Sequence, residues 1–114
     1  ESCAMRAPVH AFNSTIMSAC TTDELQIGIA CLGIIEYAFA DVSAFIGRAV
    51  VERGWVREED LVHYSLHAAI DKQHADDFFG LLHRDWSDPH GKQLIEQGLQ
   101  LGAYAFDRLY RDLL

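Results

Sequence analysis

Three residues of metal-binding types follow one another at helical spacing in the stretch 66-LHAAIDKQHADDFFGLL-82, namely His67, Asp71 and His74. At about 100° per residue they lie within about 60° of one another on one face of a helix. A solvated face would carry Lys, Glu and Gln, and a core face would carry Leu and Val. Imidazole, carboxylate and imidazole on one stripe therefore predict metal ligands, and the alternative is a buried polar network.

A carboxylate in the apolar segment 27-IGIACLGIIEYAFADVSAFIG-47 adds a second signal. Glu36 shares its helical face with apolar or small residues, whereas Asp41 points well away from it. Burying a carboxylate without a partner costs several kcal/mol or keeps it protonated, so a cation or a hydrogen-bond partner has to compensate. Beside the stripe on the later helix, Glu36 is expected to be a bridging metal ligand. Taken alone, it would be a protonated or Arg-paired structural residue.

The remaining histidines and the cysteines carry weaker signals. His63 is expected to be a second-sphere partner or a surface residue, and His83 and His90 to be solvated. His10 is expected on the first helix, from which it could face the site. Oxygen and imidazole ligands without a thiolate fit Fe, Mn or Zn, and a carboxylate-rich helical site with His favours iron or manganese. The cysteines of the helical segments are expected to be small buried thiols, because no base is arranged beside either one.

Every periodic segment indicates a helix, so the chain is predicted to be one all-α domain over residues 1–114. Helices are expected at about 8–20, 23–53 and 58–82, with Thr21 or Thr22 capping the second and Gly54 ending it. Ser87 is expected to cap a fourth helix. Gly98 and Gly102, one turn apart on that helix, would let another helix approach closely.

Composition narrows the class of function. The 114 residues carry a net charge of −8, which argues against nucleic acid and anionic membranes as partners. The apolar run 27–35 is too short for a membrane span, and the three cysteines show no CxxC spacing, so a cytoplasmic location is expected. The chain starts without Met and enters a helical pattern almost at once. We expect it to be part of a longer polypeptide, with removal of a Met or a tag as the alternative.

The pattern H-x3-D-x2-H in 67-HAAIDKQH-74, continued by 75-ADDFF-79, resembles the ligand helix of the haem-oxygenase-like di-metal oxidases. These are the iron-containing branch of the TenA and PQQ-synthase-like superfamily. The segment 34-IIEYAFADVSAFIG-47 is similar to that family's preceding core helix, with its glutamate at Glu36. The stretch 53-RGWVREEDLVHYSLH-67 is similar to the family's link into the ligand helix.

The resemblance implies a haem-oxygenase-like helical bundle, of which this chain matches the C-terminal part. It implies a di-iron or Fe/Mn centre that uses O2 to oxidise a small molecule, with Glu36, His67, Asp71 and His74 as ligands. A further Glu and His of the family fall on an earlier helix, and no residues here match them. The chain alone is therefore expected to be inactive, and its uncovered apolar faces are expected to pair in a homodimer.

Two other functions stay open at this point. One is a metal-free enzyme of the TenA or PQQ-synthase branches that binds a heterocyclic cofactor precursor, and His67 argues against the PQQ-synthase branch, which does not keep a histidine there. The other is a non-catalytic helical interaction module in which the His/Asp stripe forms a buried polar network.

Overall fold

The computed structural model describes residues 6–113 of the chain, except for the side chains of residues 62–65. The described residues form α-helices and short 3-10 turns and contain no strand, so the prediction of an all-α chain is confirmed. The elements are α1 (Ala7–Thr21), α2 (Leu25–Glu52), η1 (Glu58–Asp60), α3 (Val62–Leu81), η2 (Asp85–Ser87) and α4 (Pro89–Leu113).

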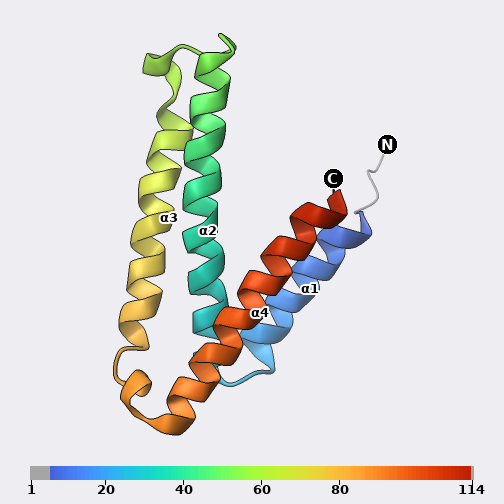
Figure 1. The fold of residues 1–114 in the computed structure, drawn as a ribbon, viewed down its shortest axis with the longest axis vertical. Helices are drawn as coiled ribbons and strands as arrows, with labels where there is room; N and C mark the ends of the chain where they lie inside the picture. The colour runs from blue at the N-terminus through green and yellow to red at the C-terminus, as the bar shows by residue number, and fades with distance from the viewer. Residues whose placement is uncertain (1–5, 114) are drawn as a thin grey trace.

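The four α-helices are arranged as two antiparallel pairs that meet at one end and diverge at the other (Figure 1). Helices α2 and α3 form one pair, and α1 and α4 form the second. The pairs join where α2 begins, α3 ends and α4 begins. The molecule is elongated, with extents of 50 × 34 × 22 Å, and much of the α2–α3 pair stands away from α1 and α4.

Glycines bring α4 against α2 at the junction of the two pairs. A Cβ atom built on Gly98 would overlap the carbonyl oxygen of Ile27 and lie 2.7 Å from the Cβ of Ala30, and one on Gly102 would overlap Ile34. Two helix backbones approach this closely only where no side chain intervenes. The predicted close approach at Gly98 and Gly102 is confirmed.

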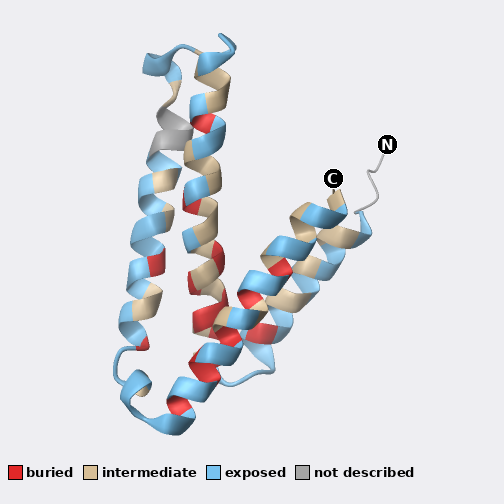
Figure 2. Ribbon diagram, in the orientation of Figure 1, coloured by how far each residue is buried: buried red, intermediate tan, exposed pale blue. Residues whose placement is uncertain are grey.

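The buried residues gather at the same junction (Figure 2). One cluster joins α1 to α2 through Ala19, Cys31 and Ile35, and a second joins α2 to α4 and the end of α3. Away from the junction, several large apolar side chains of α2 and α3 are exposed, among them Phe45, Ile46, Leu66, Ile70 and Leu81. The hydrophobic core therefore includes only one end of the α2–α3 pair. Over the rest of its length, the pair is held together by the contact between α2 and α3 alone.

The helix ends differ from the predicted ones at three places. The hydroxyls of Thr21 and Thr22 donate back to carbonyls of α1, so neither residue caps α2, whose N-cap is Glu24. The stretch after Arg57 forms the 3-10 turn η1 before α3 begins at Val62. At α4 the carboxylate of Asp88 accepts the backbone N–H of Gly91 at 2.8 Å, so Asp88 has the capping role expected of Ser87. Gly54 has φ 71° just beyond α2, as predicted for a residue that ends a helix.

Helix α2 is long and apolar enough, by length and composition alone, to cross a membrane, and 28% of its most apolar window is buried. A single helix of this kind is weak evidence for a membrane span, because core helices of soluble proteins and signal sequences meet the same criteria. The carboxylate of Glu36 lies in the middle of this helix and faces α3, where it meets the predicted metal ligands.

Candidate metal centre

Three of the four predicted ligands come together between α2 and α3. One ligand atom from each of Glu36, Asp71 and His74 lies within 4.8 Å of the others, and an oxygen of Glu36 is 3.7 Å from Nδ1 of His74. The small side chain of Ala75, directly after His74 on α3, makes this approach possible. Ala75 is fully buried. A Cβ on Gly33 would lie 2.7 Å from the ring of Phe79, so α2 and α3 are also close on the side of the ligands that faces the junction.

The three side chains lie at the edge of the α2–α3 contact and not in a sealed interior. The side chain of Glu36 is 32% exposed and that of His74 is 51% exposed. The prediction that Glu36 is buried is therefore only partly correct, because solvent or a further group can reach its carboxylate. The cluster is open on one side.

The charges in the cluster influence one another. Partial burial raises the pKa of the Glu36 carboxyl above its ordinary value, the nearby negative charge of Asp71 and a hydrogen bond with it raise that pKa further, and His74 acts in the opposite direction. Two carboxylates this close compete for a proton because both cannot be charged without repulsion. A cation between them would remove that repulsion.

The separation of the ligand atoms suits a metal ion after a small adjustment. Metal–oxygen and metal–nitrogen bonds of about 2.0–2.2 Å place opposite ligands of one ion at most about 4.4 Å apart. The observed limit of 4.8 Å is slightly larger, so rotation of one side chain would bring the three atoms onto one ion. Two oxygen ligands and one imidazole, with no thiolate, are a donor set for iron, manganese or zinc.

His67 lies outside this group of three. Its side chain is exposed, one helical turn before Asp71 on α3. A separation of seven residues places it about 10 Å along the helix axis from His74, whereas Asp71 lies between them. His67 is one turn from Asp71, and its role as a metal ligand stays a prediction.

The other residues singled out from the sequence lie away from the cluster or outside the described side chains. His10, His83 and His90 are exposed and belong to other elements, and the side chain of His63 is outside the described residues. Cys31 is buried, and burial followed by the charges of Cys20 and Asp23 raises the pKa of its thiol. Cys20 is exposed, so the expectation of a buried thiol was wrong there.

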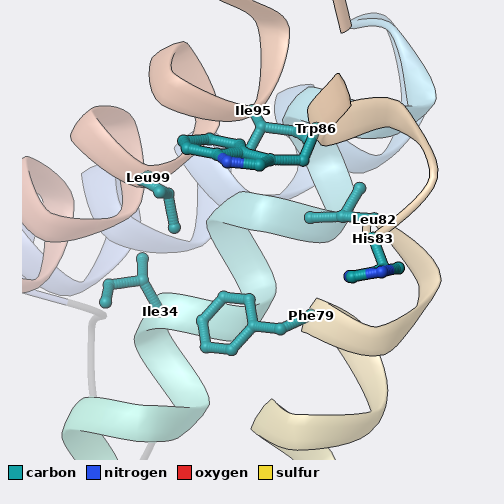
Figure 3. A pocket seen from close by; sticks show the side chains of 7 residues that line it. All are labelled: Ile34, Phe79, Leu82, His83, Trp86, Ile95 and Leu99. Atoms are coloured by element: carbon teal, nitrogen blue, oxygen red, sulfur yellow. The ribbon is translucent and has the colours of Figure 1, made fainter. Parts of the chain in front are cut away.

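Sequence reasoning missed an apolar pocket of about 410 Å³ at the junction of the two helix pairs (Figure 3). It is lined by Ile34, Phe79, Leu82, His83, Trp86, Ile95 and Leu99. The indole of Trp86 lies across the pocket near Ile95 and Leu99, and Phe79 and Ile34 form the opposite wall. A tryptophan in a short connection between two helices was the sequence signal that could have pointed to it.

The pocket and the ligand cluster occupy different faces of the α2–α3 pair. Around α2, Ile34 is about 160° from Glu36, and around α3, Phe79 is about 140° from His74. The pocket is a second candidate site, lined by residues other than the three ligands.

Comparisons of the chain with protein-family models, with curated proteins and with solved structures found no match.

Proposed function

We propose that this chain supplies metal ligands to a non-haem di-iron or Fe/Mn oxidase or oxygenase that acts with O2 on a small molecule. The fold would be a haem-oxygenase-like bundle, and the protein would work in the cytoplasm. The observation that supports this is the convergence of Glu36, Asp71 and His74 from two helices within 4.8 Å. No Lys or Arg of the described residues forms an ion pair with either carboxylate, so a bound metal cation would supply a counter-charge beside His74.

Each residue would have a distinct part in holding the metal. Glu36 and Asp71 contribute two negative charges from facing helices, and His74 contributes a neutral nitrogen one turn further along α3. The ligands sit within helices rather than loops, which limits the movement of their backbone. Bound iron would supply the one-electron chemistry with O2 that side chains cannot perform.

Elemental analysis tests the proposal directly. The chain is loaded anaerobically with Fe²⁺, desalted and measured for iron, beside Glu36→Ala, Asp71→Ala and His74→Ala. We expect each substitution to lower retained iron at least about tenfold, since loss of even an outer-shell partner of a metal site costs 10- to 100-fold in affinity.

A matched control separates loss of a ligand from loss of surface charge. Asp76→Ala removes an exposed carboxylate from the same helix and should leave the iron content unchanged. His67→Ala reports whether that residue is a fourth ligand. Iron retained equally by the wild type and Asp71→Ala would rule the proposed site out.

The apolar pocket favours a second candidate function, a metal-free protein that binds an uncharged heterocyclic molecule. Its volume lies within the range of about 300–1,000 Å³ found for small-molecule sites, and aromatic side chains line two of its walls. Calorimetric titration with benzothiazole tests this, comparing the wild type with Leu99→Phe, which fills the pocket, and Leu113→Phe, a control outside it. Binding weakened about tenfold by the first change alone would support this function, and equal binding by all three would remove it.

A further inference from the structure

We propose that Trp86 is a stacking platform for a flat, uncharged aromatic ligand in the apolar pocket, and that Lys92 holds its indole in place. The inference rests on the second candidate function, because it takes the pocket as a ligand site. It adds the shape of the molecule that the pocket selects and a positioning residue outside the lining. It makes no use of the metal ligands, so the metal-free chain is sufficient to test it.

The indole of Trp86 presents a flat side to the space inside the pocket. Figure 3 shows this ring nearly edge-on, with one flat side toward Phe79 and Ile34 across the pocket. Trp86 and Phe79 are the two carbocyclic aromatic residues of the lining, and they belong to opposite walls. A ligand between these walls would therefore contact an aromatic ring on each side.

A lysine covers the other flat side of the indole. Nζ of Lys92, in the first turn of α4, lies 4.9 Å from the centroid of the Trp86 ring. Lys92 does not line the pocket, so its ammonium group lies on the side of the indole that faces away from it. An ammonium group over an exposed aromatic ring favours that arrangement about two- to fivefold. Lys92 therefore restricts the indole without occupying the space of a ligand.

The backbone that carries Trp86 is also held in place. The backbone N–H of Trp86 donates to the carbonyl oxygen of Leu82 at 3.2 Å, which ties η2 to the end of α3. On the other side, Gly91 lets α4 approach η2, because a Cβ atom there would overlap the carbonyl oxygen of Asp85. With the indole held by Lys92, the wall is preformed, and little loss of conformational freedom opposes binding.

The composition of the lining selects the class of ligand. The lining contains no Lys, Arg, Asp or Glu, so a charged molecule would lose its hydration without gaining a counter-charge from them. Aromatic pairs in stacked or edge-to-face contact strengthen binding about 2- to 13-fold beyond the burial of area. A puckered saturated ring of the same size buries similar area but makes no aromatic pair. The pocket should therefore prefer the flat ring.

Calorimetric titration in EDTA tests this preference with benzothiazole and with cyclooctanone, a saturated ring that has the same number of non-hydrogen atoms. We expect benzothiazole to bind at least about fivefold more tightly, because two aromatic walls act together. Trp86→Leu should lower this ratio at least about twofold. Trp55→Phe, which changes a 69% exposed residue beyond the end of α2, should keep the ratio. In that variant Trp86 is the only tryptophan, and benzothiazole should quench its emission.

Substitutions of Lys92 test its positioning role. Lys92→Met keeps an unbranched side chain without the charge and should weaken benzothiazole binding about two- to fivefold. Lys92→Arg keeps a cation that stacks on aromatic rings and should restore the affinity. The matched control is Lys72→Met, because Nζ of Lys72 lies 5.8 Å from the ring centroid of Tyr37, and neither residue lines the pocket. This control should bind benzothiazole as the wild type does.

The possible results separate this inference from the second candidate function. Equal affinity for benzothiazole and cyclooctanone would overturn the inference and leave the pocket standing as a ligand site. Failure of both molecules to bind would overturn the inference together with the second candidate function. Equal affinities of Lys92→Met and Lys92→Arg would show that Lys92 does not hold the indole. Binding that leaves the emission of Trp86 unchanged would show that the ligand does not stack on it.

Discussion

At the scale of single residues, only part of the predicted His/Asp stripe on α3 belongs to the candidate metal centre. Asp71 and His74, three residues apart, meet one carboxylate of the neighbouring helix, whereas His67, seven residues from His74, lies outside the group. Helical periodicity predicts that all three share a face, and this is correct as geometry. Helical periodicity does not tell which residues of α3 lie opposite Glu36, because that depends on the register of α2 against α3.

Replacing Glu36 by glutamine should change how the stability of the metal-free chain depends on pH. The pKa of Glu36 is raised above its usual 4.5 by burial and by Asp71, so the folded chain holds this proton more tightly than the unfolded chain. Its contribution to stability is then fully present below the ordinary pKa and is lost as the pH rises through the folded value. Glu36→Gln lacks this loss and should melt at a higher temperature than the wild type at neutral pH.

Thermal melting followed by circular dichroism, in EDTA and from pH 4 to 7, measures this difference. The gap between Glu36→Gln and the wild type should widen with rising pH. Glu52→Gln, an exposed change at the end of the same helix, should show no such trend. A gap that stays constant across the range would contradict the raised pKa.

At the scale of the elements, the helices and the small-residue contact between α2 and α4 could be predicted from the sequence, whereas several helix ends could not. Hydrophobic periodicity and the Gly98–Gly102 spacing depend on the chain alone. Capping depends on competing local hydrogen bonds: Thr21 and Thr22 satisfy carbonyls of α1 instead of N–H groups of α2. Likewise, the acidic residues 58–60 form a 3-10 turn instead of the first turn of α3, and Asp60 of this turn forms an ion pair with Arg57.

Two glycine substitutions should have opposite effects on stability. Gly98→Ala places a methyl group against the backbone of Ile27 and 2.7 Å from Ala30, and overpacking of this kind costs about 1–3 kcal/mol. The gain in helix propensity offsets up to about 1 kcal/mol of it. Gly80→Ala in α3 meets nothing within 4 Å and should stabilise the chain by up to about 1 kcal/mol.

Urea unfolding of both variants measures the two effects. The midpoint should fall for Gly98→Ala and rise or hold for Gly80→Ala. A Gly98→Ala chain as stable as the wild type would mean that α4 packs less closely on α2 than the structure indicates.

At the scale of the whole molecule, the divergence of the two helix pairs divides the chain into a packed and a sparsely packed part. Helices α2 and α4 carry eight and six buried residues, mostly near the junction. Among the described side chains within α3, Ala75 alone is fully buried, and this helix contacts mainly α2. The sequence could not reveal this, because a helix with ligand-type residues and scattered apolar ones has no clear buried face until its neighbour is known.

Hydrogen exchange should follow this division and should respond to metal at one place. Backbone amides open in cooperative units, and units with few buried contacts open most readily. We therefore expect the amides of α3 to exchange faster than those of residues 27–35 in α2, where six residues of the segment are buried and α4 covers the helix. Mn²⁺ bound by Glu36, Asp71 and His74 would tie the two helices together near their middles. It should slow exchange in α3 around residues 71–75 and leave α1 unchanged, as measured by mass spectrometry of peptic peptides with and without the ion. Protection that spreads equally over all four helices would point to stabilisation of the whole fold, and protection confined to α4 would place the ion elsewhere.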